Sequence, residues 1–129
     1  MKMKYIFLIL LFISFNTFAM EISIYKWSKR LLIVSASSLD DKVLINTKNF
    51  LSNHKCEVKD RNLEIIVFLN QNNNKFEKPN FITNQYGIWL LGYDGMVKDY
   101  SSDDSILLRL FDLIDSMPMR KNEIKSNLC

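Results

Sequence analysis

The chain has 129 residues, of which 48% are hydrophobic and 24% charged, and its net charge is +3 at pH 7. This length suits a single domain with one modest core. Lys2 and Lys4 are the only charged residues among the first 19, and without them 15 of the 17 basic residues remain against 14 acidic ones, a net charge of +1. Such a balance gives no indication of nucleic-acid binding or of attraction to a membrane surface.

Residues 1–19 predict a secretory signal peptide. Two lysines precede an apolar run that ends at Thr17, Phe18 and Ala19, and this order is typical of an export signal. The run is shorter than the roughly 20 apolar residues that span a bilayer. We expect cleavage after Ala19, a mature domain over residues 20–129, and a periplasmic or extracellular protein with no stable membrane span. An uncleaved N-terminal anchor is the alternative.

The chain contains two cysteines, Cys56 and Cys129. In an oxidising compartment they could form a disulfide. The alternatives, which we favour over the disulfide, are a buried, inert Cys56 and a free or intermolecular Cys129. Their spacing matches neither a Cys-x-x-Cys redox pair nor a zinc site, and we expect no metal or other cofactor.

The first half of the domain reads as strand, helix, strand. Residues 31–34 are continuously apolar, as in a buried strand. Asp40 and Asp41 suit the N-terminus of a helix, whose apolar face would carry Val43, Thr47, Phe50, Leu51 and His54. Residues 63–69 are rich in β-branched and aromatic side chains, which indicates a second strand parallel to the first.

His54 is the only histidine of the chain. It lies near the C-terminal end of the predicted helix, where its ring can bond to a terminal backbone carbonyl. We favour this structural role over a catalytic one because no nucleophile or second ligand is visibly paired with it.

The second half predicts a loop, a short helix, a hairpin and a closing helix. Residues 70–80 are polar and rich in asparagine. Residues 81–86 could form a short helix capped by Asn80, and residues 88–100 form two strands around Asp94-Gly95. The last helix would present Leu107, Leu110, Phe111 and Ile114 on one face and end before Pro118.

This order of elements predicts an α/β fold in which a four-stranded mixed sheet carries helices on both faces. Two parallel strands followed by an antiparallel pair make the thioredoxin-like arrangement. The prediction uses element order alone.

Three segments resemble the family of domains of unknown function numbered 4174. They are Trp27-x-x-Arg30-x-Leu32-x-Val34, Gly92-x-Asp94-Gly95-x-Val97-Lys98 and Ile114-Asp115-x-Met117-Pro118-Met119-Arg120-x-x-Glu123. The resemblance covers nearly all of the mature chain, and the last segment is its most specific part. It implies a thioredoxin-like fold related to peroxiredoxins in exported bacterial proteins. It brings no established reaction, although thiol or peroxide chemistry has been proposed from the fold.

The turn after the first strand is the candidate site loop, with Ser35, Ser37 and Asp40. A thioredoxin-type enzyme needs a thiolate of low pKa there, next to a helix N-terminus. The loop offers only hydroxyls and carboxylates, and we expect Cys56 at the opposite end of the sheet. Hydrolysis through Ser35 or Ser37 lacks a matched base and a nucleophile-elbow motif.

Arg30 and Arg120 belong to the segments that carry the resemblance. A guanidinium can order a carboxylate or bind an external anion bidentately. We expect structural salt bridges, with Asp99 or Asp115 as candidate partners, and keep anion binding as the alternative.

Two hypotheses about function follow. The first is a secreted, non-catalytic thioredoxin-like domain that binds a protein or another envelope component. The second is a thiol or peroxide oxidoreductase that uses Cys56, with Cys129 as a possible resolving cysteine.

Overall fold

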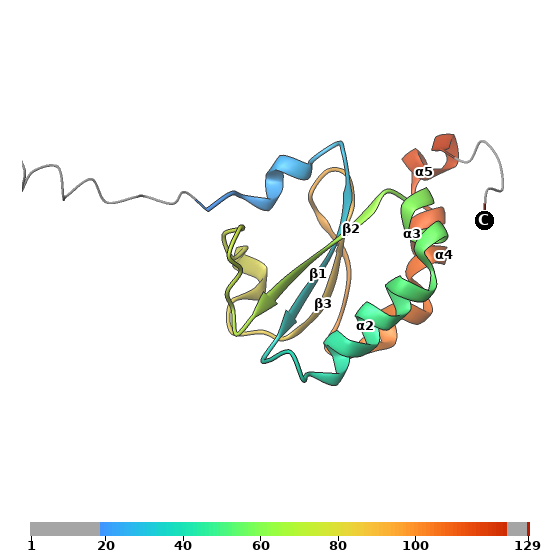
Figure 1. The fold of residues 1–129 in the computed structure, drawn as a ribbon. Helices are drawn as coiled ribbons and strands as arrows, with labels where there is room; N and C mark the ends of the chain where they lie inside the picture. Colours follow the sequence, from blue (N-terminus) through green and yellow to red (C-terminus); the bar gives the residue numbers. More distant parts are fainter. Residues whose placement is uncertain (1–18, 124–128) are drawn as a thin grey trace, which may run out of the picture.

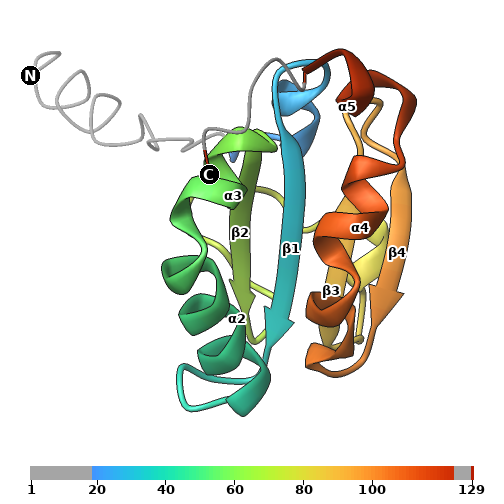
Figure 2. The same cartoon turned by 90° about the vertical axis from the view of Figure 1, so that its right-hand side faces the viewer.

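A four-stranded mixed sheet organises the computed structural model, which describes residues 19–123 and 129 (Figures 1 and 2). The strands are β1 (Arg30–Ala36), β2 (Leu63–Leu69), β3 (Gly87–Leu91) and β4 (Val97–Ser101), in the order β2-β1-β3-β4. β1 is parallel to β2 and antiparallel to β3, and β3 is antiparallel to β4. The predicted α/β class and mixed sheet are confirmed, whereas the predicted signal segment lies almost entirely outside the described residues.

β1 is the central element, because all seven of its residues are buried. Leu32, Val34 and Ala36 belong to the core on one face of the sheet. Leu31 and Ile33 belong to the core on the other face. Successive side chains of a strand point to opposite faces, so a strand covered on both sides has the continuous apolar run seen in the sequence.

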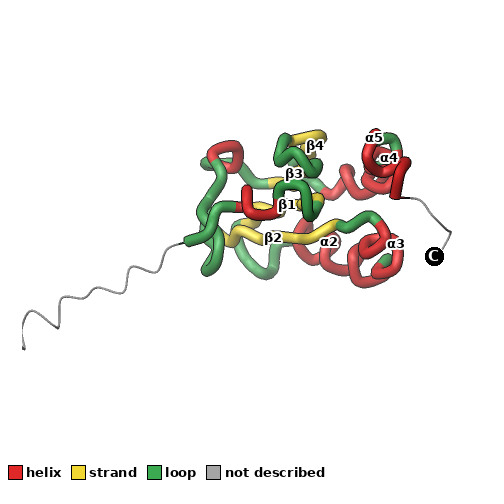
Figure 3. Tube along the Cα trace, turned by 90° about the horizontal axis from the view of Figure 1, so that it is seen from above, coloured by secondary structure: helices red, strands yellow, loops and turns green. Residues whose placement is uncertain are grey.

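The described α-helices all cover one face of the sheet (Figures 1 and 3). They are α2 (Lys42–Asn53), α3 (Lys55–Asp60), α4 (Leu110–Asp115) and α5 (Pro118–Glu123). The other face carries the 3-10 turns η1 (Ile22–Tyr25) and η2 (Asn80–Ile82) and the loop between β2 and β3.

The expectation of helices on both faces is therefore wrong. The segment after β2 is too rich in asparagine, lysine and proline to form an amphipathic helix. It covers the sheet instead with a few apolar side chains, among them Phe76 and Ile82, which are 7% and 0% exposed.

α2 begins and ends as its sequence predicts. The carboxylate of Asp41 caps the helix by accepting a hydrogen bond from the Val43 N–H at 2.9 Å. Leu44 and Thr47 are buried against the sheet. At the other end, Nδ1 of His54 lies 2.8 Å from the Phe50 carbonyl oxygen, which is the expected bond to a terminal carbonyl.

Three local features differ from the sequence-based expectations. α3 was not predicted, since six residues are too few for a helical pattern to emerge. The helix predicted over residues 81–86 is the short turn η2, and Asn80 does not cap it with its side chain. The strands β3 and β4 are joined by residues 92–96, a longer turn than the two residues expected.

The closing helix is also interrupted. Residues Asp104–Leu108 form the 3-10 turn η3, α4 starts only at Leu110, and α5 begins at Pro118. Arg109 at the junction has φ −117°, outside the helical range. The predicted helix nevertheless ends before Pro118, because proline is favoured at the first turn of a helix and disfavoured inside one.

Gly87 is required where β3 starts. Its φ is +143°, and an added Cβ would lie 2.5 Å from the backbone oxygen of Ser101. We expect Gly87→Ala to lower the free energy of unfolding by roughly 3 kcal/mol, because strain and a backbone clash combine. Denaturant titration measures the change.

Gly95 supplies the matched control. Its φ is +77°, but an added Cβ would meet only the flexible side chain of Lys26. Gly95→Ala should therefore lower the free energy of unfolding by about 1 kcal/mol. Equal losses in the two variants would contradict the role assigned to the backbone contact at Gly87.

Candidate functional site

The three segments that carry the family resemblance meet at the end of the sheet where β1 begins. Arg30 is the first residue of β1, the second segment forms the β3–β4 turn, and the third runs from α4 into α5. Together they line a pocket of about 360 Å³. Its lining residues are Trp27, Arg30, Gly92, Tyr93, Asp94, Lys98, Ser116, Met117, Pro118 and Met119.

Arg30 is 1% exposed and is held by groups of the protein itself. Its Nη1 and Nη2 donate to the Glu123 carboxylate at 3.0 and 3.2 Å, and Nη1 also donates to the Arg61 carbonyl oxygen at 2.8 Å. The guanidinium carbon lies 4.1 Å from the centroid of the Tyr93 ring. The remaining donor, Nε, is buried and has no hydrogen-bond partner within residues 19–123 and 129.

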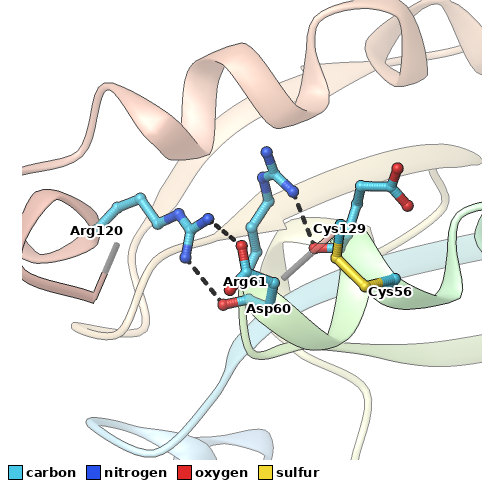
Figure 4. The surroundings of a disulfide bond; sticks show 6 residues. Cys56, Asp60, Arg61, Arg120 and Cys129 are labelled. Atoms are coloured by element: carbon cyan, nitrogen blue, oxygen red, sulfur yellow. Dashed lines mark hydrogen bonds and ion pairs between the residues drawn. A yellow bond between two sulfur atoms is a disulfide. The ribbon is translucent and has the colours of Figure 1, made fainter. Parts of the chain in front are cut away.

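Arg120 occupies a second buried position, 2% exposed, between the carboxylates of Asp60 and Asp115, and Figure 4 shows it beside Asp60. Its Nη2 lies 2.5 Å from Asp60 Oδ2 and its Nε lies 3.0 Å from Asp115 Oδ1. Arg61 also bonds Asp115 bidentately, at 2.8 and 3.0 Å. Arg120 Nη1 lies 3.5 Å from Glu123 Oε2, so Glu123 joins both arginines in one charged cluster, which we call the arginine network.

The expected partners of the arginines are only partly right. Asp115 does pair with Arg120, whereas Asp99 pairs with Arg109 at 2.6 Å. The carboxylate that neutralises Arg30 is instead that of Glu123. Glu123 belongs to the third family-like segment, but it was not among the partners predicted from the sequence. Because carboxylates of the chain occupy both guanidinium groups, the geometry favours structural salt bridges over binding of an external anion.

The network holds the pKa values of two carboxyl groups below their ordinary range. Burial of Glu123 opposes its ionisation, but hydrogen bonds from Arg30 and Tyr93 outweigh burial and lower its pKa. Burial likewise opposes ionisation of Asp115, and the hydrogen bonds from Arg61 and Arg120 lower its pKa. Burial and the bond to Glu123 raise the pKa of Tyr93, which keeps the phenol protonated as a donor.

A disulfide joins Cys56 of α3 to the C-terminal residue Cys129 (Figure 4). The sequence left this pairing open. The Cα atoms are 5.8 Å apart, and both residues are exposed. Cys56 precedes Asp60, the partner of Arg120, by about one helical turn. The chain end is thus linked covalently to the helix that the arginine network ties to α5.

The candidate site loop lies at the other end of β1, apart from the pocket and the disulfide. Ser35 is 2% exposed, and its Oγ accepts a hydrogen bond from Gln71 Nε2 at 3.3 Å. Ser37 and Asp40 are exposed in the turn before α2. The structure therefore does not bring this loop together with Cys56, Cys129 or the two arginines.

Tyr93, Asp60 and Arg61 were not anticipated from the sequence. Tyr93 occupies an unspecified position of the Gly92-x-Asp94 segment, and Asp60 and Arg61 lie in a stretch expected to be a simple connection. The sequence did offer a signal for Glu123, because it follows Arg120 by three residues on one helix and such a pair can interact. Within residues 19–123 and 129, no cluster of His, Cys, Asp and Glu side chains could hold a metal ion.

Substitution of Arg120 tests the arginine network. Arg120→Met leaves Asp60 and Asp115 without their shared cation, and we expect the free energy of unfolding to fall by roughly 2–4 kcal/mol because one partner of a buried ion pair is removed. Chemical denaturation measures it. Lys121→Met, at an exposed neighbouring position, should change stability by less than about 0.5 kcal/mol. An unchanged Arg120→Met would contradict the structural role.

The lowered pKa of Glu123 predicts a loss of stability in acid. A carboxyl group whose folded-state pKa lies below its unfolded value of 4.5 contributes its full stability above that pH and loses it as the pH falls through the folded-state pKa. Glu123→Gln should cost roughly 1–3 kcal/mol at pH 7 and make the curve of stability against pH flatter below pH 4.5. Glu77→Gln, at an exposed position, should leave the curve unchanged, and an equally steep acid loss in Glu123→Gln would refute this assignment.

The described residues include no helix that is both long and apolar enough to cross a membrane. Neither the curated proteins nor the solved structures contain a match to this chain. A family model described as a domain of unknown function, DUF4174, matches residues 21–123. This range holds every part of the pocket and of the arginine network. The chain therefore belongs to the DUF4174 family.

Proposed function

We propose that this protein is a secreted thioredoxin-like domain that works as a binding module and not as a redox enzyme. Its partner would be a protein or another component of the cell envelope. One observation carries the proposal. The β1–α2 turn, where a thioredoxin-type enzyme needs its thiolate, has Ser35, Ser37 and Asp40, and both cysteines of the chain are joined to each other at the opposite end of the sheet.

The sheet supports the thioredoxin-like part of the proposal. Its order β2-β1-β3-β4, with a parallel pair followed by an antiparallel pair, agrees with the arrangement expected from element order. One face departs from that expectation, since 3-10 turns and a loop cover it in place of a helix.

Two features support export. The first 19 residues have the composition of a signal peptide. A disulfide between Cys56 and Cys129 is typical of an oxidising compartment, because cytosolic thiols are kept reduced. Both features agree with a periplasmic or extracellular location.

A thiol or peroxide oxidoreductase is the second candidate function. It is favoured by the exposure of both cysteines, since an exposed disulfide is open to attack by an external thiolate. In such a reaction Cys56 would be the attacking thiol after reduction and Cys129 the resolving one.

Redox assays separate the two candidates. We expect the wild type to give neither reduction of insulin disulfides by dithiothreitol above the uncatalysed rate nor peroxide consumption above that of Cys56→Ser. The β1–α2 turn provides no thiolate, and the disulfide joins the C-terminus to α3. Turnover that disappears in Cys56→Ser but persists in Ser37→Ala would establish the oxidoreductase and refute the binding module.

A further inference from the structure

We propose that the pocket at the start of β1 binds an extended, proline-containing segment of a partner protein, which packs on Trp27. This inference rests on the proposed function, since it names the kind of partner that the binding module recognises. It places the binding surface at the end of the sheet opposite the Ser35–Asp40 turn.

Trp27 combines two unfavourable properties. Its side chain is 67% exposed, and its φ is +65°, in the left-handed region that a bulky residue rarely adopts. Such a conformation costs about 1–3 kcal/mol and persists where the surroundings hold it. Here the Trp27 N–H donates to the Tyr93 carbonyl oxygen at 2.8 Å, which ties the backbone of Trp27 to the β3–β4 turn. Binding of a partner accounts for an exposed aromatic side chain held in this way.

Another part of the pocket lining is apolar and adaptable. It comes from Met117, Pro118 and Met119 at the junction of α4 and α5, and Met119 is 47% exposed. Thioether side chains adjust to the shape of an apolar partner. The volume of about 360 Å³ lies at the lower end of the roughly 300–1,000 Å³ typical of ligand pockets.

The charged residues of the pocket are neutralised within the protein. Arg30 pairs with Glu123, and Lys98 Nζ lies 2.8 Å from Asp94 Oδ2. The other oxygen of Asp94 accepts from the Met96 N–H at 3.0 Å. Because each of these charged side chains is paired within the protein, the pocket has no excess charge that would attract a charged ligand. An uncharged segment is therefore the expected ligand.

Two side chains of the pocket lining keep hydrogen-bond donors that a ligand could use. The ammonium of Lys98 has three N–H groups, one of which donates to Asp94, and the Trp27 indole carries one N–H group. A suitable ligand offers acceptors, apolar rings and few donors. Proline residues meet this demand, because they lack a backbone N–H, keep the carbonyl oxygen and form an extended helix that docks on aromatic surfaces.

Heteronuclear NMR of the disulfide-intact protein tests the inference. The probe is a blocked peptide of repeated Pro-Pro-Leu units, and the control is a Gly-Ser peptide of equal length. We expect the Pro-Pro-Leu peptide to shift the Trp27 indole N–H and Arg30 Nε–H signals. The Trp89 indole, only 4% exposed, serves as the internal reference and should stay in place. Equal shifts with both peptides, or none at Trp27 and Arg30, would overturn the proposal.

Trp27→Asn removes the indole while keeping a residue that tolerates positive φ, so the variant should fold. We expect its affinity for the Pro-Pro-Leu peptide to fall by about tenfold or more, as for an aromatic anchor. Leu39→Ala, 63% exposed in the β1–α2 turn, should bind as the wild type does. Unchanged affinity in Trp27→Asn would also overturn the proposal.

Two other outcomes are informative. Shifts of the pocket signals with vesicles of anionic phospholipid and none with the peptide would assign the surface to a membrane and refute the peptide. Failure of peptide binding in a protein without redox turnover would reject this inference and leave the binding module in place, whereas turnover that depends on Cys56 would reject the module itself.

Discussion

Arg30 and Arg120 are almost completely buried, and a buried guanidinium is stable only while a carboxylate neutralises it. Glu123 lies within reach of both. It thereby connects β1 to α5, and Arg120 connects α5 to Asp60 of α3. The pocket is lined by residues from the same segments, so its shape depends on the carboxylates that keep these two cations in place.

The two ends of β1 have different chemistry for this reason. At its start, charged side chains, a phenol and a disulfide hold α3 and α5 against the sheet. At its end, Ser35 is buried and Ser37 and Asp40 face solvent in a short turn. A serine hydroxyl does not ionise at neutral pH and cannot take up the redox role of a thiolate. The charged and disulfide-bonded end of the sheet thus lies opposite the turn in which a thioredoxin-type enzyme would need its thiolate.

The disulfide and the ion pairs act on the same helix. Cys56 and Asp60 lie on α3, and each is joined to the C-terminal part of the chain, one by a covalent bond and the other by Arg120. Below about 150 residues a domain has a limited core, and short helices such as α3 and α5 gain little from their own hydrogen bonds. Cross-links at their surfaces supply stability that their few apolar contacts do not.

Much of this structure follows from local patterns. The apolar run of β1, the β-branched run of β2 and the Asp41 cap each predicted its element, because strand burial and capping depend on residues close in sequence. Local patterns failed where an element is short or irregular, as in α3 and in the break at Arg109. There, packing against the sheet outweighs intrinsic preference.

The sequence by itself therefore determined the strands, the main helix and the three segments that mark the family. It also determined that the turn after β1 contains no cysteine. Only the tertiary structure decided that these segments share one pocket, that Glu123 is the partner of Arg30, that Cys56 meets Cys129, and that the α-helices lie on a single face. The contact of Glu123 with Arg30 and that of Cys56 with Cys129 join residues 93 and 73 positions apart. Their pairing depends on how the chain crosses the sheet, which composition and spacing do not specify.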